Sequence, residues 1–452
     1  MFERKVGNLG TCTFFSNSLI FYIPDCYVYP NYRIISKQSY SQPNTKYNIE
    51  SVEEYSMMTP RERFFSTMNH QEPDRVLIDM GKQVGSLHKY EYIKLKEHLG
   101  NPDWMKNENV ILDEMAQTVV LDEMLLQKFG VDFRWLIPKW VGIKPFKTEE
   151  EYGYFDMWGS KFKGVGDYYA LTQEPLKEAT SIEEIESYDW PDPNNLGMFE
   201  GLEAEAKHLF ENTDYVVGAD GIKGGILQTC LWVRGYSKFL LDLAMNPKFA
   251  EVLLAKVTDL FKQMYTNYLK AVGKYAQLIY ITDDLGTQSS QFMSKAMFQK
   301  LIKPHFKDLN DHIKSLADIK IMFHCDGAID PLMEDLIETG IDIINPVQTS
   351  TKGMDDTQAL KEKYGDRLCF HGAIDVQQIM PKATPAQIKY EVARRMYDLG
   401  QNGGYICATC HNIGHDIPVE NITTFYEAAQ EYGQYPLDNL LKIIEKGYPE
   451  NE

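Results

Sequence analysis

The feature that most constrains the fold is a repeated alternation of short apolar runs with longer helical segments. Eight of the runs are typical of strands, and helix-period segments separate most of them. Parallel strands need a helical crossover between them, so this order favours an α/β fold. The predicted strands are residues 75–81, 131–136, 215–220, 278–284, 319–322, 341–348, 367–372 and 404–411. Eight such units predict a closed (β/α)8 barrel.

An open doubly wound sheet is the alternative architecture. A dinucleotide-binding sheet of that kind carries a G-x-G-x-x-G loop after its first strand, and no glycine-rich phosphate loop follows residues 75–81. The glycine-rich stretch 218–225 comes after the third strand and lacks that spacing. We interpret it as a tight turn that opens a helix.

The helices are predicted from capping signals and apolar periodicity. The first has Thr59 as its N-cap and Pro60 at its first position. The predicted helices are residues 60–70, 90–99, 115–129, 198–211, 224–245, 247–270, 294–315, 331–339, 355–364 and 384–400. Residues 140–173 interrupt the alternation with aromatic segments separated by glycines, which predicts an antiparallel hairpin insertion.

The chain divides near Met57. Residues 1–56 are rich in Tyr, Asn, Ser and Pro and lack periodicity, so we predict an N-terminal extension that is disordered. Residues 57–452 are predicted to form the barrel.

Charge and cysteine usage exclude some classes of partner. The net charge of −19 argues against nucleic acids and acidic membrane surfaces, which bind proteins with excess Lys and Arg. No apolar run is long enough to span a bilayer. Seven scattered cysteines, an odd number, do not suggest a disulfide framework. A reducing, cytoplasmic location is the resulting prediction.

Polar side chains follow several of the predicted strands. The carboxyl ends of barrel strands meet at one rim, where the loops carry the chemistry. The relevant segments are 282–284, 324–326, 345–348, 371–375 and 410–412.

His324 and Asp326 are two residues apart and therefore share a face of their strand, while Cys325 points away. A histidine and a carboxylate in this arrangement are half of a metal site, and Cys410 or His411 is the candidate third ligand. The alternative is that His324 is a hydrogen-bonded core residue.

Two further features near the rim carry charge. Asp283 and Asp284 are adjacent, so only one of them can point into the barrel mouth and act as a base or ligand, while the other caps a loop. Arg134 could clamp an anionic group or pair with a carboxylate of the chain.

The chain resembles the uroporphyrinogen decarboxylase superfamily, in particular its branch of uncharacterised relatives and cobalamin-linked methyltransferases. The resemblance runs in order from Met58 to about Tyr432 and implies the (β/α)8 barrel. It rests on the segments TPRER (59–63), GVDFR (130–134), DDLGTQ (283–288), FHCDG (323–327), NPVQ (345–348), GAID (372–375), HNI (411–413) and DIPVENI (416–422).

The resemblance does not fix the reaction. The decarboxylases carry an arginine-rich segment after the first strand that holds the porphyrinogen carboxylates, and residues 79–85 contain no arginine here. In the methyltransferase branch, a His-x-Cys and a later Cys hold zinc. The corresponding residues of this chain are His324, Asp326 and His411, a set that suits zinc or another divalent metal. Alternatively, no metal binds, and these residues hold a corrinoid or a methyl donor by hydrogen bonds.

Three hypotheses follow from the resemblance. The first is a methyltransferase or demethylase that acts on a small methyl donor or acceptor with a corrinoid protein as partner; a homodimer is a family-level expectation. Its predicted catalytic residues are Asp283, Asp284 and His324, and its predicted substrate-binding residues are Arg134, Gln348 and Asp375. The second is a cofactor-independent decarboxylase of a tetrapyrrole or a smaller carboxylated substrate, with Asp283 as proton carrier. The third is a non-catalytic barrel that binds a corrinoid or tetrapyrrole.

Overall fold

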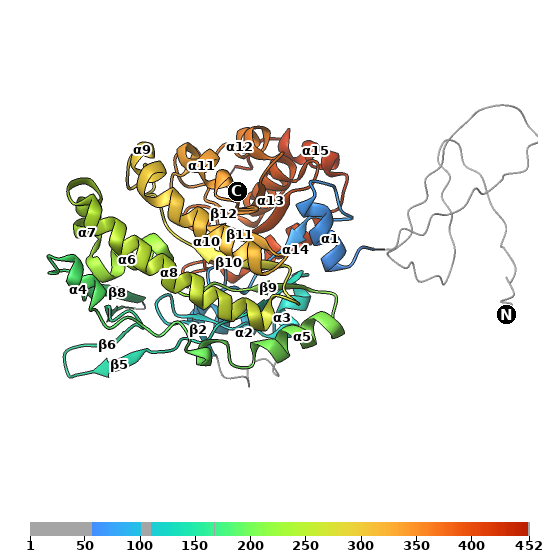
Figure 1. The fold of residues 1–452 in the computed structure, drawn as a ribbon. Coiled ribbons are helices and arrows are strands. Elements are labelled where there is room, and N and C mark those ends of the chain that lie inside the picture. Colours follow the sequence, from blue (N-terminus) through green and yellow to red (C-terminus); the bar gives the residue numbers. More distant parts are fainter. Residues whose placement is uncertain (1–56, 101–109, 167, 451–452) are drawn as a thin grey trace, which may run out of the picture. The chain divides into compact units, whose positions relative to one another are not determined.

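The computed structural model describes residues 57–100, 110–166 and 168–450, and one compact unit spans Met58–Glu452. The predicted extension, residues 1–56, lies outside the described residues. Eight parallel strands form one sheet in the order β1-β14-β13-β12-β11-β10-β9-β4. Figure 1 labels β9, β10, β11 and β12 of this sheet. The strands are β1 (Leu77–Ile78), β4 (Phe133–Leu136), β9 (Val216–Ala219), β10 (Leu278–Thr282), β11 (Lys320–His324), β12 (Ile343–Val347), β13 (Cys369–Ile374) and β14 (Tyr405–Thr409).

The first and last strands of this order come together at Asp132, just before β4. Its backbone N–H donates to the carbonyl of Ile78 in β1 at 2.9 Å, and its carboxylate accepts from the N–H of Ile78 at 2.8 Å. The sheet is therefore a nearly closed barrel with helices between its strands, which confirms the predicted (β/α)8 architecture and excludes the open sheet.

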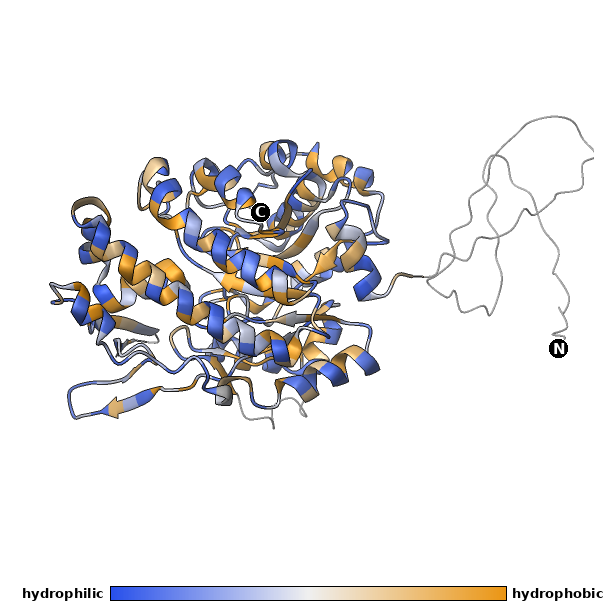
Figure 2. Ribbon diagram, viewed as in Figure 1, coloured by the Kyte–Doolittle hydropathy of each residue, from blue (hydrophilic) through white to orange (hydrophobic). Residues whose placement is uncertain are grey.

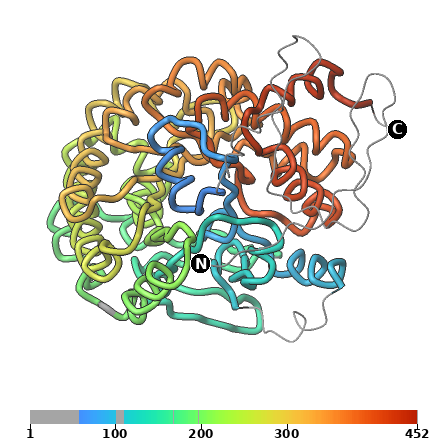
Figure 3. Tube along the Cα trace, turned by 90° about the vertical axis from the view of Figure 1, so that its right-hand side faces the viewer, coloured from blue at the N-terminus to red at the C-terminus, as the bar shows by residue number. Residues whose placement is uncertain are grey.

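Alternate residues of the strands fill the barrel interior. They form one buried cluster with two residues of α1 (Pro60–Met68), Phe64 and Met68, so this helix covers the end of the barrel at which the strands begin. Figure 3 shows the dark blue α1 segment among the surrounding elements. The interior members of the cluster are Leu77, Phe133, Trp135, Val216, Leu278, Tyr280, Met322, Ile343, Cys369 and Ile406.

Helices lie between the strands and after the last of them, and most of these helices bury an apolar face against the outside of the barrel while their polar faces point outward (Figure 2). They are α2 (Lys89–His98), α3 (Glu123–Lys128), α4 (Ile182–Glu186), α5 (Leu202–Asn212), α6 (Ile226–Arg234), α7 (Tyr236–Met245), α8 (Pro247–Val272), α9 (Lys295–Met297), α10 (Lys303–Leu316), α11 (Met333–Glu338), α12 (Thr357–Tyr364), α13 (Pro385–Gly400), α14 (Val419–Tyr432) and α15 (Leu441–Ile444). None of these described helices is long and apolar enough to cross a membrane.

Three predicted helices differ from the observed ones. The helix predicted for 198–211 starts only at Leu202 (α5), because a 3₁₀ turn at Leu196–Phe199 and Gly201, with a φ of 87°, precede it. The helix predicted for 115–129 is wrong in its first half, where Thr118–Val119 (β3) pairs with Ile111–Asp113 (β2) and α3 begins only at Glu123. The β-branched pair at 118 and 119 favours this strand. The helix predicted for 224–245 is divided by Gly235, whose φ of 88° ends α6 before α7 starts.

The predicted antiparallel insertion is confirmed. Four strands, β5 (Lys144–Lys147), β6 (Tyr152–Phe155), β7 (Lys161–Val165) and β8 (Tyr168–Gln173), form a separate sheet in sequence order. Tyr154 and Phe162, from β6 and β7, are buried and belong to the same apolar core as the barrel helices. One face of the insertion therefore packs on the barrel unit.

Candidate metal centre

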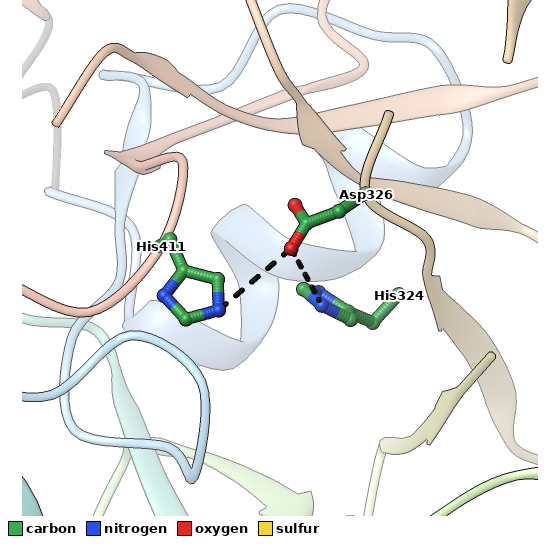
Figure 4. A group of neighbouring side chains, drawn as sticks. All are labelled: His324, Asp326 and His411. Atoms are coloured by element: carbon green, nitrogen blue, oxygen red, sulfur yellow. Dashed lines mark ion pairs between the residues drawn. The ribbon is translucent and has the colours of Figure 1, made fainter. Parts of the chain in front are cut away.

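His324, Asp326 and His411 meet at the carboxyl end of the barrel. His324 is the last residue of β11, Asp326 lies in the loop that follows it, and His411 lies two residues beyond the end of β14. One ligand atom from each residue lies within 4.8 Å of the other two. Figure 4 shows both imidazole rings turned toward the same carboxylate oxygen. The structure therefore brings together the three residues that the sequence predicts as metal ligands.

The spacing suits a divalent ion. Asp326 Oδ2 lies 3.6 Å from His324 Nε2 and 3.7 Å from His411 Nε2. Zinc–ligand bonds of about 2.0–2.1 Å place tetrahedral ligand atoms about 3.4 Å apart. The other oxygen of the carboxylate, Asp326 Oδ1, is buried without a hydrogen-bond partner among the described residues. The His411 side chain is 41% exposed, so one side of the group is open to solvent or substrate. These residues fit a metal with an open coordination position.

The backbone around Asp326 is fixed by its neighbours. The N–H of Asp326 donates to Asp284 Oδ1 at 3.0 Å, and the N–H of Gly327 donates to Gln348 Oε1 at 2.6 Å. Gly327 has a φ of 105°, and a Cβ there would lie 2.6 Å from a backbone atom of Gly286. Only glycine fits this turn without strain, and the turn aims the Asp326 carboxylate at the two histidines.

A chain of buried hydrogen bonds sets the orientation of His324. His324 and Asn345 are register partners on adjacent strands, and Asn345 Oδ1 lies 2.7 Å from His324 Nδ1. The Asn345 amide nitrogen lies 2.6 Å from His371 Nδ1, and His371 Nε2 lies 2.8 Å from Asp79 Oδ2. An amide oxygen accepts and an amide NH₂ donates. His324 therefore carries its proton on Nδ1, which leaves the lone pair of Nε2 directed at the candidate metal position.

The far end of this series of hydrogen bonds is the Asp79 carboxylate, and both of its oxygens have partners. Asp79 Oδ2 accepts from Lys82 Nζ at 2.9 Å, and Asp79 Oδ1 accepts from Trp135 Nε1 at 2.8 Å. Burial, assisted by the charge of Lys82, lowers the pKa of His371 to about 4. Burial alone would raise the pKa of Asp79, but Lys82 and His371 hold it well below its ordinary value. A neutral His371 thus donates from Nε2 to an ionised Asp79.

The charges at the mouth favour an ionised Asp326. Burial would raise the pKa of Asp326, but the adjacent His324 lowers it below its ordinary value. The reverse influence applies to His324: burial would lower the pKa of its imidazole, and the charge of Asp326 raises it to a net value above the ordinary one. Burial and the charge of Asp326 both raise the pKa of Asp284.

Both cysteines near the group point elsewhere. Cys325 is fully buried in the apolar core outside the barrel interior, as the alternation along the strand predicts. The thiol of Cys410 is also buried and lies 3.2 Å from the carbonyl of Val347. Burial raises the pKa of both thiols, so neither is a ready thiolate ligand.

The two adjacent aspartates, Asp283 and Asp284, have different surroundings and therefore different roles. Asp283 accepts from the N–H groups of Leu227 and Gln228, at 2.8 and 2.6 Å, and so caps the first turn of α6. This approach requires Gly225, because a Cβ there would lie 2.5 Å from the Asp283 carboxyl carbon. Asp284 is therefore the aspartate beside the candidate metal position, and the structure places Asp283 in a capping role instead.

The predicted substrate-binding residues do not join the group. The Arg134 guanidinium pairs with Glu123 at 2.7 Å, donates to two backbone carbonyls and stacks on Tyr215. The Asp375 carboxylate accepts from three backbone N–H groups of its own loop. These polar groups are already engaged within the chain, and Gln348 acts on the loop of Asp326 as described above.

Sequence reasoning missed the Asp79–His371–Asn345 chain. The sequence predicts polar groups in the segments that hold Asn345 and His371 and an absence of arginine in the segment that holds Asp79 and Lys82, but it predicts no role for these four residues. The available signal was their position: each is a polar residue in the second half of a predicted, largely apolar strand, where an inward side chain must find a buried partner. The pairing itself joins residues 292 positions apart, and no local pattern shows it.

These features define a (β/α)8-barrel protein with a candidate metal centre at the carboxyl end of its strands, and comparison with known proteins gives the family. Residues 172–432 match the family model described as uroporphyrinogen decarboxylase (URO-D). A uroporphyrinogen decarboxylase of Psychromonas ingrahamii is 31% identical over 284 residues, which cover 59% of this chain and 74% of that protein. One from Alcanivorax borkumensis is 25% identical over 390 residues, which cover 82% and 98%.

Among solved structures, a methyltransferase from Methanosarcina mazei superposes with a TM-score of 0.57 at 15% identity, covering 83% of this chain and 99% of that chain. This likeness shows the shared fold. With more than half of its length matched by the family model, the chain belongs to the uroporphyrinogen decarboxylase family, whose members are enzymes.

Proposed function

We propose that this protein is a metal-dependent methyltransferase that moves a methyl group between a corrinoid protein and a small acceptor or donor. The observation that carries the proposal is the arrangement of His324, Asp326 and His411, three ligand atoms with spacing suited to one ion and one open side. The methyltransferase named among the structural neighbours is consistent with this activity.

A divalent metal bound by these residues would act as a Lewis acid toward a thiol, hydroxyl or amine at the open position. The chain's own residues prepare that position. Asn345 and His371 hold the His324 ring in one tautomer, while Gln348 and Gly327 hold the loop of Asp326. With ligands held in place before binding, little ordering remains when substrate arrives.

We assign Asp284 as the proton acceptor beside this position. Its Oδ1 accepts from the N–H of Asp326, and its pKa is raised by burial and by the Asp326 charge. A carboxylate of raised pKa is a stronger base and can take the proton that an acceptor loses on ionisation. Asp283 is not available for this role, because its carboxylate accepts from the N–H of Leu227 in the first turn of α6.

Decarboxylation is the second candidate, because the family model and the curated relatives described above carry the name uroporphyrinogen decarboxylase. A porphyrinogen substrate brings many carboxylates and requires cations. The basic residues Lys82 and Lys223, which follow β1 and β9, are each paired with an aspartate, Asp79 and Asp113. This pairing favours methyl transfer.

The test uses purified protein, zinc, a small thiol and free methylcobalamin as the probe for the corrinoid partner. Transfer of the methyl group as CH₃⁺ to the thiolate gives a thioether and cob(I)alamin, which is followed by absorbance. We expect activity that is lost in His324→Ala and in Asp326→Ala and retained in the matched control Cys325→Ala. Methyl transfer that is unaffected by chelation and by the two ligand variants would contradict the proposal. Release of CO₂ from uroporphyrinogen, insensitive to chelator, would establish the decarboxylase alternative.

A further inference from the structure

The break between α6 and α7 turns one tyrosine toward the carboxyl end of the barrel strands. In a continuous helix, residues 228 and 236 would lie about 12 Å apart along the axis. Gly235, with a φ of 88°, ends α6, and α7 begins at Tyr236. The Tyr236 hydroxyl lies 2.5 Å from Nε2 of Gln228, which belongs to the first turn of α6. The side chain of Tyr236 therefore folds back along α6 to the end at which that helix begins.

This end of α6 lies beside the candidate metal centre. The backbone N–H of Gln228 donates to Asp283 Oδ1 at 2.6 Å, and the next residue along the chain, Asp284, accepts from the N–H of Asp326. Burial is the largest cause of the raised pKa of Tyr236, and the charge of Asp284 adds to it. The hydroxyl is therefore the covered end of the side chain, and it lies near the carboxylate that we assign as proton acceptor.

The hydrogen bonds at the Tyr236 oxygen determine what this group can offer a ligand. Hydrogen bonds from the side chains of Gln228 and Trp232 lower the pKa of Tyr236 and so oppose the effect of burial. The amide NH₂ and the indole N–H can only donate. The tyrosine oxygen is therefore the acceptor in both, and its own O–H remains to donate. The residues that the structure describes supply no acceptor for this proton.

Exposure and charge indicate which kind of atom receives the proton. Tyr236 is 42% exposed although its hydroxyl end is covered, so its side chain lines an opening. The charges of Asp284 and Asp283 both act on its hydroxyl, and they would repel an anionic oxygen placed against it. An uncharged oxygen, in an alcohol or an amide carbonyl, accepts the hydrogen bond without that repulsion.

We propose that Tyr236 determines specificity by donating its O–H to an uncharged oxygen of the small molecule that occupies the open side of the metal centre. The small methyl acceptor or donor then carries an alcohol or carbonyl oxygen a few atoms away from the atom that meets the metal. Gln228 and Trp232 are positioning residues, because they direct the O–H without touching the ligand. This inference rests on the proposed function and deepens it by naming a substrate class.

The test measures thiol binding to protein loaded with cobalt(II) in place of zinc, through the thiolate-to-cobalt absorption, so it does not require methyl transfer. The probes are 2-mercaptoethanol, 3-mercaptopropan-1-ol and 4-mercaptobutan-1-ol. Each is paired with the alkanethiol of the same length, in which a methyl group replaces the hydroxyl. The measured quantity is the ratio of the Kd of the alkanethiol to the Kd of the mercaptoalcohol.

Removing the hydroxyl of Tyr236 should change this ratio. One net hydrogen bond of about 1 kcal/mol corresponds to about a fivefold difference in Kd. We expect Tyr236→Phe to lower the ratio about fivefold for the chain length that reaches the hydroxyl and to leave the Kd of every alkanethiol unchanged. The matched control Tyr152→Phe alters a tyrosine that is 44% exposed and donates to the Gly166 carbonyl within the insertion, and it should leave the ratio unchanged.

The outcomes separate this inference from the proposed function. Absence of thiolate-to-cobalt absorption in the unaltered protein would overturn the metal-dependent function and this inference with it. Three results would overturn the inference alone while the absorption is present. They are a ratio that Tyr236→Phe leaves unchanged at all three chain lengths, equal weakening of alcohols and alkanethiols in that variant, and tighter binding of the anionic 3-mercaptopropionate than of 3-mercaptopropan-1-ol.

Discussion

Two histidine–aspartate pairs lie toward the carboxyl end of the barrel strands. They differ in whether their polar atoms already have hydrogen-bond partners within the chain. His371 and Asp79 are 2.8 Å apart and fully buried, and Lys82 and Trp135 occupy the remaining positions of the carboxylate. His324 and Asp326 are 3.6 Å apart, too far for a direct hydrogen bond, and Asp326 Oδ1 has no partner in the described chain. The same residue types therefore serve as a rigid support in one place and as available ligands in the other.

Asn345 hydrogen-bonds to the histidine of each pair, so the buried pair influences the orientation of the open one. It accepts from one imidazole and donates to the other, so the buried pair determines which nitrogen of His324 faces the mouth. Residues that hydrogen-bond to a metal-binding histidine in this way change metal affinity by about 10–100-fold in other proteins. The comparison predicts large effects on stability from the buried pair and large effects on binding from the open one.

The largest expected effect comes from removing the charge partner of Lys82. Asp79→Ala leaves a 1% exposed ammonium without its carboxylate. The cost of breaking a buried pair in this way is about 3–5 kcal/mol of unfolding free energy. Urea denaturation measures it. The matched control Lys307→Ala breaks an exposed pair with Asp311 and should change stability by less than about 1 kcal/mol. Similar losses in the two variants would show that the buried Asp79–Lys82 pair contributes no more to stability than an exposed pair.

A pH titration of stability tests the neutral state of His371. Its folded pKa of about 4 lies below the ordinary value of 6.5, so the unfolded chain takes up a proton that the folded chain refuses. Stability should therefore fall as the pH drops from about 6.5 toward 4. His371→Gln should show a smaller fall over that window. Parallel curves of melting temperature against pH would show that His371 is not held neutral.

Removing the bridge between the pairs should weaken metal binding without abolishing it. In Asn345→Ala, His324 keeps its place on β11 but loses the acceptor for its Nδ1 proton. We expect the Kd for zinc to rise about 10–100-fold, measured by competition with a chelating dye. Affinity equal to that of the unaltered protein would mean that the hydrogen-bond chain does not prepare the ligand.

The smallest expected effect is at the cysteine between the two predicted ligands. Cys325→Ala removes a buried thiol that packs in the outer core, so zinc affinity should stay within about twofold while stability falls slightly. A loss of zinc binding as large as that of His324→Ala would contradict the strand register, which turns this side chain away from the mouth.

The barrel and the metal group were predictable for a shared reason. Strand alternation is a local property, so it places His324 and Asp326 on one face, and it brings strand ends 324 and 411 to one rim once the barrel closes. The same alternation, applied to Arg134 between the inward Phe133 and Trp135, would have turned that arginine outward, toward Glu123.

The remaining contacts depend on pairings between distant segments. Asp283 and Asp375 are at strand ends, as catalytic carboxylates often are, but unpaired N–H groups at α6 and in the 377–379 loop occupy them. The role of each carboxylate depends on how closely a helix or loop approaches it. Gly225 permits the close approach of α6 to Asp283, but the sequence alone does not show that this glycine lies against Asp283.

The central claim is that His324, Asp326 and His411 hold one divalent metal. The most direct measurement is the zinc content of the dialysed protein by elemental analysis, alongside single alanine variants of the three residues. We expect about one equivalent in the unaltered protein, and loss of the bound zinc in His324→Ala, Asp326→Ala and His411→Ala. Less than about a tenth of an equivalent of any metal after reconstitution, or zinc retained in all three variants, would contradict it.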